Sequence, residues 1–324
     1  MRAIVTGGLG FIGTNLVEFL LSQSHEVLCL DKNSYASNYE YHLLLAQSNS
    51  QYSIQILDLS TSEELEKIVT SFKPNIVFHL AAESHVDRSI ESPGDFIQSN
   101  IVGTYNLLEA IRKQKNSQTK LIHVSTDEVF GSHEHLKFTE TTRYDPSSPY
   151  SASKAASDHL VRAWSKTYNL CVNITNCSNN FGPFQHKEKL IPKAIRCLIE
   201  RKEIPIYGTG ENIRDWLFVL DHVNGLYEIA NNGKENQSYN IGSSNEVTNI
   251  SIIRQICNVY DQLTGTKNSE SLISFVSDRP GHDFRYSIDA TKLMRETTWK
   301  PQSSFTEALR KTIDWYIKNP TYLN

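Results

Sequence analysis

The sequence contains little cysteine and no marked excess of charge of either sign. Its five cysteines are an odd number and include no Cys-x-x-Cys pair. That pattern favours reduced, buried thiols in a cytoplasmic protein over a disulfide framework, and we predict no bound metal. The formal net charge of −4 gives no indication of a nucleic-acid partner.

Long apolar runs are also missing, because no segment approaches the roughly 20 residues that a membrane-spanning helix needs. The first residues lead directly into an apolar strand pattern, so we expect no signal peptide. Of the 324 residues, 39% are hydrophobic and 21% are charged, which suits one large or two smaller globular domains. We therefore expect neither a membrane nor a nucleic acid as a partner.

The first thirteen residues carry the most informative pattern in the chain. An apolar strand at residues 3–5 leads into Gly7-x-x-Gly10-x-x-Gly13, and apolar residues then recur at helical spacing over residues 11–20. Without Cβ atoms, Gly7 and Gly10 can adopt positive φ and let a pyrophosphate approach the main chain. The N-terminus of the following helix offers unpaired N–H donors to that anion. Strand, glycine turn and helix together predict a dinucleotide-binding site.

Two acidic residues at strand ends extend this prediction. Asp31 ends a second strand at residues 26–30, and a carboxylate about 20 residues past the glycines accepts hydrogen bonds from the adenosine ribose. It would repel a 2′-phosphate, so we expect NAD rather than NADP, with a cap or turn role as the alternative. Asp58 follows a third strand at residues 53–57 and suits either the adenine amino group or a strand-end turn.

Strand and helix patterns alternate through the first half of the chain. Further strands are expected at residues 74–80, 120–124 and 170–174, and helices at residues 63–72, 96–112 and 150–168. This order predicts an α/β fold, a doubly wound parallel sheet (Rossmann) with helices on both faces. Ligands of such sheets bind beyond the carboxyl ends of the strands.

The composition changes after residue 176, where polar, Gly- and Pro-containing stretches begin. We expect residues 1–176 to form the NAD-binding Rossmann domain, with segments near 219–245 returning to it. Residues 177–324 would then form mainly a smaller C-terminal substrate-binding domain.

A second motif suggests catalysis. Tyr150 and Lys154 are four residues apart at the start of a helix and so share one face. A tyrosine titrates near 10, and a nearby ammonium favours the phenolate and lowers that value. Ser125 and Thr126 end the preceding strand and offer hydroxyl donors to a carbonyl oxygen. Taken alone, Tyr-x-x-x-Lys is more often an exposed helix face, but the glycine loop and the strand end Ser-Thr-Asp favour an active site.

These motifs resemble the extended short-chain dehydrogenase/reductase superfamily. Within it, five stretches resemble the nucleotide-sugar 4,6-dehydratases, most closely those that act on dTDP-glucose. They are residues 79–90, 125–131, 176–183, 213–216 and 278–283. The resemblance covers essentially the whole chain, and the adjacent Asp127 and Glu128 after Thr126 are its most specific feature.

The resemblance implies an NAD-dependent lyase that converts dTDP-glucose to dTDP-4-keto-6-deoxyglucose. Thr126 and Lys154 would assist Tyr150, which takes the proton of the C4 hydroxyl as hydride passes to NAD. Glu128 would remove the C5 proton, and Asp127 would protonate the departing C6 hydroxyl, since carboxyl groups in different environments can divide such tasks. A UDP-glucose 4,6-dehydratase, a UDP-sugar 4-epimerase and a catalytically silent NAD-binding sensor are the alternatives. Epimerases have no use for the acidic pair.

The resemblance also implies binding roles and a homodimer formed through the long helices that begin near Phe96 and Tyr150. Cofactor contacts are implied for Gly7, Gly10, Phe11, Ile12, Gly13, Asp31, Lys32, Asn33, Ser34, Asp58, Leu59, Leu80, Ala81, Ala82, Ser84, Ser99, Tyr150, Lys154 and Asn180. Sugar-nucleotide contacts are implied for Ser84, Thr126, Asn179, Lys189, Leu190, Pro205, Tyr207, Arg214, Asn249, Arg279 and His282.

Overall fold

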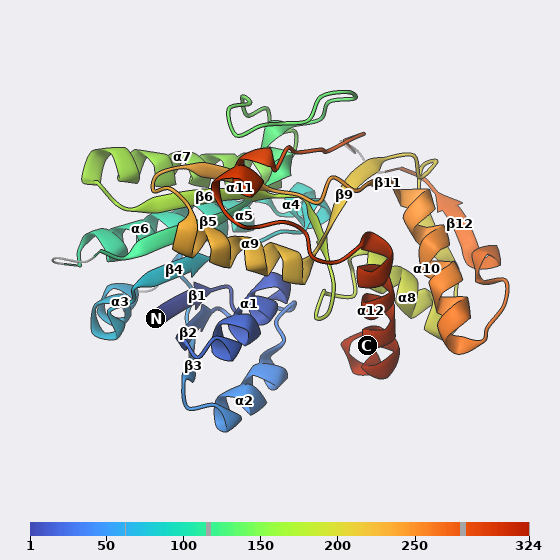
Figure 1. Cartoon of the computed structure of the whole chain (residues 1–324), viewed down its shortest axis with the longest axis horizontal. Helices are drawn as coiled ribbons and strands as arrows, with labels where there is room; N and C mark the ends of the chain where they lie inside the picture. Colours follow the sequence, from blue (N-terminus) through green and yellow to red (C-terminus); the bar gives the residue numbers. More distant parts are fainter. Residues whose placement is uncertain (62, 115–117, 279–282, 324) are drawn as a thin grey trace.

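A seven-stranded sheet forms the centre of the computed structural model, which describes residues 1–61, 63–114, 118–278 and 283–323 (Figure 1). All neighbouring strands are parallel, in the order β10-β6-β5-β4-β1-β2-β3. The strands are β1 (Arg2–Thr6), β2 (Glu26–Asp31), β3 (Tyr52–Ile56), β4 (Ile76–His79), β5 (Lys120–Thr126), β6 (Val172–Cys177) and β10 (Ser238–Ile241). The predicted doubly wound parallel sheet is confirmed, and its order reverses between β1 and β4.

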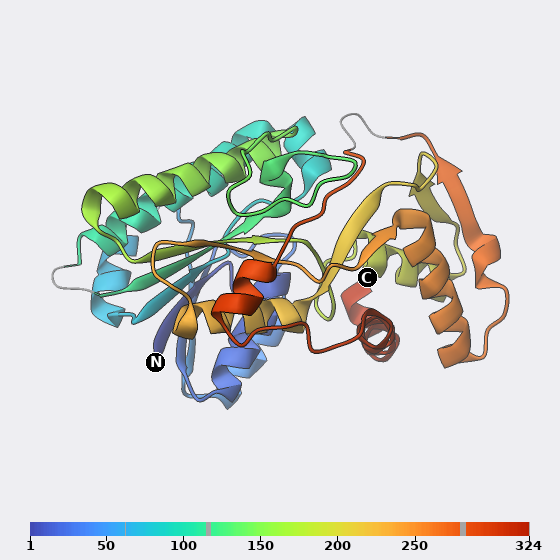
Figure 2. The same cartoon turned by 45° about the horizontal axis from the view of Figure 1, so that its top comes forward.

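Helices cover both faces of this sheet. They are α1 (Phe11–Ser22), α2 (Tyr39–Ser48), α3 (Leu65–Phe72), α4 (Val86–Glu91), α5 (Pro93–Phe96), α6 (Gly103–Arg112), α7 (Pro149–Tyr168) and α9 (Val219–Asn232). Figure 2 shows α6 and α7 on one face and α1 and α9 on the other, and these helices contact each other in those pairs. Because both faces are covered, the central strands are apolar and buried along their length, as Val77, Phe78 and Ile122 illustrate.

The later part of the chain builds a smaller unit beside the main sheet (Figure 1). It contains a three-stranded sheet in the order β11-β9-β7 and a two-stranded sheet of β12 and β8. These strands are β7 (Asn179–Phe181), β8 (Ile204–Tyr207), β9 (Ile213–Phe218), β11 (Glu246–Thr248) and β12 (Ile273–Val276). Its helices are α8 (Leu190–Glu200), α10 (Asn249–Thr264) and α12 (Phe305–Lys318), whereas α11 (Thr291–Glu296) packs against β10 of the main sheet.

Local sequence signals explain where α7 begins and ends. Ser148 and Ser151 form a reciprocal capping box, and Pro149 occupies the first turn, where its missing N–H costs nothing. Asn169 ends the helix with a left-handed φ of 56°. The strand expected at residues 170–174 therefore starts two residues later, at Val172.

The prediction of a single helix over residues 96–112 is wrong. Helical structure starts earlier, at Pro93, and a π-helical turn at Ile97–Val102 joins α5 to α6. Such wide turns cannot be read from apolar spacing, because they shift the helix face by an extra residue. The pattern also did not predict α2, whose N-terminal cap makes no side-chain hydrogen bond.

The expected return of later segments to the main sheet is confirmed. β10 extends the sheet beside β6, and α9 packs against β5 and β6. Across the described ranges, every helix is too short or too polar to cross a bilayer.

Candidate active site

The loop between β1 and α1 has its glycines at points of close approach. Gly7 has a φ of +69°, and a Cβ there would lie 2.6 Å from the backbone nitrogen of Ala81. A Cβ at Gly13 would overlap the carbonyl oxygen of Gly7. Gly10 caps α1 without a side chain, so the first turn keeps backbone N–H donors for an anion. This cradle fits the pyrophosphate of a dinucleotide.

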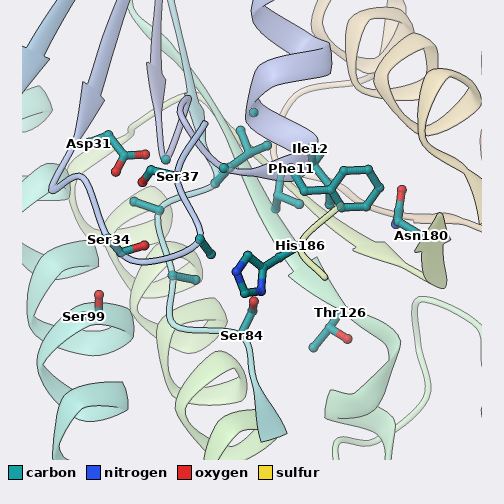
Figure 3. A pocket seen from close by; sticks show the side chains of 18 of the residues that line it. Phe11, Ile12, Asp31, Ser34, Ser37, Ser84, Ser99, Thr126, Asn180 and His186 are labelled. Carbon is teal, nitrogen blue, oxygen red and sulfur yellow. The ribbon is translucent and has the colours of Figure 1, made fainter. Parts of the chain in front are cut away.

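A cavity of about 310 Å³ opens at the carboxyl ends of the central strands, where the strand order reverses (Figure 3). It is lined by most of the expected cofactor-binding and catalytic residues. These are Gly7, Gly10, Phe11, Ile12, Gly13, Asp31, Lys32, Ser34, Asp58, Leu59, Leu80, Ala81, Ala82, Ser84, Ser99, Thr126, Asp127, Glu128, Tyr150, Lys154 and Asn180. Figure 3 shows Asp31 and Ser34 at one end and Thr126 and Asn180 at the other.

Asp31 is held at the end of β2 by backbone donors. Its Oδ2 accepts from the N–H of Leu9 at 3.1 Å, and its Oδ1 accepts from the N–H of Asn33 at 2.8 Å. Burial raises the pKa of the Asp31 carboxyl, and these two bonds oppose that shift. Asn33 has a left-handed φ of 56° and serves Asp31 through its backbone without lining the cavity. Lys32 pairs with Glu83, its Nζ 2.6 Å from Oε1.

The π-helical turn places Ser99 on the cavity wall with the buried Asn100 behind it. The side chain of Asn100 accepts from the N–H of Glu83 at 2.8 Å and donates to its carbonyl oxygen at 3.0 Å. The turn thereby clamps the loop that follows β4. Asp58 lines the cavity too, while its Oδ1 accepts from the N–H of Ser60 at 2.8 Å, so a turn role accompanies any contact with adenine.

The acidic pair lies at the end of β5, in a short 3₁₀ helix (Asp127–Phe130). The hydroxyl of Thr126 accepts from the N–H of Glu128 and donates to Oδ1 of Asp127, both at 3.2 Å. Asp127 is only 2% exposed, and its Oδ2 has no hydrogen-bond partner among the residues described. Burial, followed by the charges of Glu128 and Asp215, raises the pKa of Asp127 well above its usual value. Asp127 is therefore suited to hold a proton at neutral pH.

Tyr150 and Lys154 both line the cavity, but the expected lowering of the tyrosine pKa is wrong for the protein's own groups. Burial and the charge of Glu128 raise the pKa of Tyr150 well above 10, and the hydrogen bond with Thr126 only partly opposes this. The Nζ of Lys154 donates to the carbonyl oxygen of Val124 at 2.8 Å. The free-energy cost of desolvating the phenolate is thus larger than the stabilisation that its hydrogen bond with Thr126 provides.

The hydroxyls of Ser125 and Thr126, at the end of β5, bond to different partners. Ser125 donates its hydroxyl to Oδ2 of Asp158 at 2.9 Å and also lines the cavity, so its service to a carbonyl oxygen stays a prediction. Thr126 lies on the cavity wall beside Asp127 (Figure 3). Alternation along the strand separates the two side chains.

Four of the expected substrate residues line the cavity: Thr126, already described, and Ser84, Asn179 and Lys189. The Nζ of Lys189 donates to the carbonyl oxygen of Ser84 at 3.2 Å, linking α8 to the loop after β4. Oδ1 of Asn179 is buried without a hydrogen-bond partner among the described residues, so it is suited to a ligand donor.

Five other expected substrate residues, all described in the structure, do not line this cavity. Leu190, Pro205, Tyr207, Arg214 and Asn249 lie on α8, β8, β9 and α10. The guanidinium of Arg214 donates to the backbone carbonyls of Ile213, Asp283 and Phe284 and lies 4.5 Å above the ring of Tyr286. The expected positions Arg279 and His282 fall outside the described residues.

Among the cavity residues that sequence reasoning missed are five with polar side chains in loops: Tyr35, Ser37, Gln185, His186 and Glu188. They come from loops without a recognisable motif. Tyr35 donates its hydroxyl to Oε1 of Glu188 at 2.9 Å and thereby joins the loop after β2 to the segment before α8. The one available signal was an aromatic residue shortly after Asp31, where a nucleotide base is expected.

Comparison with known proteins agrees with this site. Residues 4–312 match the family described as GDP-mannose 4,6 dehydratase. The dTDP-glucose 4,6-dehydratase of Salmonella typhimurium is 46% identical over 343 residues, which cover 100% of this chain and 95% of that protein. The chain belongs to the dTDP-glucose 4,6-dehydratase family. The resemblance to nucleotide-sugar 4,6-dehydratases is confirmed.

Solved structures with a similar fold include a dTDP-glucose 4,6-dehydratase and a UDP-glucose 4-epimerase. The dTDP-glucose 4,6-dehydratase of Streptomyces venezuelae, crystallised with NAD, has a TM-score of 0.92 and 38% identity, covering 99% of this chain and 98% of that one. The UDP-glucose 4-epimerase of Thermotoga maritima has a TM-score of 0.89 and 26% identity, covering 99% and 100%. The fold is thus shared by dehydratases and epimerases, and the site residues have to distinguish the two activities.

Proposed function

We propose that the protein is an NAD-dependent lyase that converts dTDP-glucose to dTDP-4-keto-6-deoxyglucose. The observation that carries this proposal is the acidic pair, Asp127 and Glu128, on the wall of the cavity that also contains Tyr150 and the glycine loop. Burial suits Asp127 to be the acid. The names of the relatives at 46% identity support the same substrate.

The cradle at Gly7 and Gly13 would hold the pyrophosphate of NAD, and Asp31 and Lys154 its two riboses. NAD, when bound, accepts a hydride from C4 of the sugar and returns it to C6. Tyr150 takes the proton from the C4 hydroxyl. Because the protein's own groups disfavour the phenolate, this step depends on positive charge beside Tyr150.

The acidic pair carries out the elimination. The ketone at C4 makes the C5 proton acidic, and Glu128 removes it as a general base. Asp127 gives its proton to the C6 hydroxyl, which leaves as water while a C5–C6 double bond forms. The sugar has then lost one water. Hydride delivered to C6 from the reduced cofactor, together with a proton returned to C5 by Glu128, would give the 4-keto-6-deoxy sugar. The proton that Tyr150 took from the C4 hydroxyl balances, through solvent, the one that Asp127 gave to the leaving water.

The test is to incubate the pure full-length protein separately with dTDP-glucose and UDP-glucose, without added reductant. We expect the alkali-induced absorbance of a 4-keto-6-deoxy sugar from dTDP-glucose, with no net formation of NADH. Epimerised UDP-sugar without keto product would favour a UDP-sugar 4-epimerase, and keto product from UDP-glucose alone would reassign the nucleotide. No product from either sugar would refute the proposal.

The division of labour along the chain is part of this proposal. Residues 1–176, with segments near 219–245, serve the cofactor, and residues 177–324 serve mainly the sugar nucleotide. The membership of β10 in the main sheet and the separate small sheets of the later chain support this division. The cellular site is the cytoplasm, in keeping with free thiols at all five cysteines.

A homodimer formed through α6 and α7 completes the proposal. The two helices lie side by side and present exposed aromatic rings, with Tyr105 44% and Tyr168 45% accessible around Trp164. A two-fold interface would bury the same patch from both subunits. Light scattering should give a dimer that Tyr105→Glu converts to a monomer. The control Leu44→Glu, on an apolar residue of α2 that is even more exposed, should stay dimeric.

A further inference from the structure

The inner face of α7 continues one turn beyond the predicted catalytic pair. Tyr150, Lys154 and Asp158 follow each other at intervals of four residues and are all buried. Lys154 donates to the carbonyl oxygen of Val124 at 2.8 Å. Asp158 has no place in the resemblance or in the mechanism above, yet it is completely inaccessible to solvent.

Asp158 contacts two residues of β5, one on each side of Val124, whose carbonyl oxygen accepts from Lys154. Its Oδ1 lies 3.0 Å from Nε2 of His123, and its Oδ2 accepts the hydroxyl of Ser125 at 2.9 Å. His123 and Ser125 flank Val124 in the strand. One carboxylate thus sets how far α7 can slide along β5, and with it whether Nζ of Lys154 meets the Val124 carbonyl.

The rise of one turn of α7 nearly matches the rise of two residues of β5, so successive turns of the helix meet alternate residues of the strand. Four helical residues rise about 6 Å, and two strand residues rise about 6.6 Å. Tyr150 interacts with Thr126, and Lys154 with Val124 two residues earlier in the strand. A shift of one strand residue would separate Tyr150 from the Thr126 hydroxyl and Lys154 from the Val124 carbonyl.

Charge is the second link between Asp158 and Lys154. Burial lowers the pKa of Lys154, and the charge of Asp158 opposes that shift. Burial also opposes the charge on Asp158, but the hydrogen bond from His123, the charge of His123 and then the charge of Lys154 hold the pKa of its carboxyl below its usual value. The pair is therefore two buried opposite charges that support each other.

Five other titratable groups surround the pair. They are His79 on β4, His123 on β5, Cys177 on β6, Arg162 on α7 and Tyr144 in the loop before α7. Burial lowers the pKa of both histidines, although Asp158 opposes the shift of His123, and burial raises the pKa of the Cys177 thiol to about 12. Tyr144 donates to Oδ2 of Asp158 at 2.8 Å and accepts from Arg162.

We propose that Asp158 is a positioning residue that holds Lys154 against β5 and keeps it in the ammonium form that Tyr150 needs. The inference rests on the proposed function for its catalytic consequence. Its structural part, the coupling of two buried charges, stands without any substrate, so the two can fail separately.

The first experiment is a double-mutant cycle in thermal unfolding, with Asp158→Asn, Lys154→Met and both together in the full chain. Each single substitution should lower the melting temperature by roughly 5 °C or more, because it strands one buried charge. The melting temperature of the double variant should fall by much less than the sum of the two single losses. In the control cycle, Tyr144→Phe with Lys154→Met, the losses should add, since the tyrosine carries no charge.

Additive losses in the first cycle would overturn the proposal. Should Asp158→Asn alone fail to fold, a folded double variant is the expected result. A double variant that folds no better than the single one would show that Asp158 acts only as a packing element, and the proposal would be abandoned.

The second experiment is the pH profile of turnover on dTDP-glucose. Activity should fall at alkaline pH as Lys154 loses its proton, and Asp158→Asn should move that limb down by about one pH unit, the effect of removing one buried opposite charge. Asp158→Glu should keep the alkaline limb at the pH of the parent protein, and Tyr144→Phe should not move the limb. An active Asp158→Asn with an unmoved limb contradicts the proposal. A parent protein without turnover contradicts the proposed function, and the unfolding cycle then decides the structural claim.

Discussion

Replacing Asp127 by asparagine is the most direct test of the acidic pair. The carboxyl is 2% exposed, has one unpartnered oxygen and lies near the charges of Glu128 and Asp215. Asparagine has nearly the same shape and keeps an oxygen for the Thr126 hydroxyl, so the fold should persist. It lacks the proton that the C6 hydroxyl needs in order to leave.

Loss of a general acid typically costs about 10²–10⁴ in rate, or about 2.7–5.5 kcal/mol of barrier. We therefore expect Asp127→Asn to reduce formation of the 4-keto-6-deoxy sugar by that factor, while the melting temperature stays within a few degrees. The assay is the alkali-induced absorbance of the product, with a melting curve on the same sample. Asp145→Asn, an exposed carboxyl in the loop that packs against Gly131, is the matched control and should retain full turnover. Turnover of Asp127→Asn within threefold of the parent would refute the role of this carboxyl as the acid.

Tyr150→Phe removes the proposed base and should reduce turnover by about 10²–10⁴ with an unchanged circular dichroism spectrum, and near-parent rates would reassign the base. Gly13→Ala should lower stability by about 1–3 kcal/mol in denaturant titrations, because its Cβ would overlap the Gly7 carbonyl. Gly94→Ala, where a Cβ meets no atom within 4 Å, should be neutral or stabilising, and equal losses in both variants would contradict the packing argument. The raised pKa of Asp127 means that the folded protein binds a proton more tightly than the unfolded chain, so this group's contribution to stability falls as pH rises above 3.8 towards the raised value. Asp127→Asn lacks this loss, so its stability relative to the parent should increase with pH in melting curves between pH 4 and 8, and a constant difference would contradict burial of the carboxyl.

Local patterns in the sequence determined the fold and one half of the site. The glycine loop, the alternation of strands with helices, Asp31 at a strand end and the spacing of Tyr150 and Lys154 are each contained in short segments. Their geometry follows from backbone sterics and periodicity, which do not depend on distant residues. That is why the parallel sheet and the cavity at its carboxyl ends agree with the expectations.

Tertiary structure alone decided the state of the reactive groups. Asp127 owes part of its raised pKa to Asp215, which β9 brings in from the smaller unit. Burial and the charge of Glu128 raise the pKa of Tyr150. Asp158 and Glu188 acquire their contacts only when segments far apart in sequence meet. Desolvation and charge–charge energies depend on what surrounds a group from every direction, and one chain segment contains only a part of those surroundings.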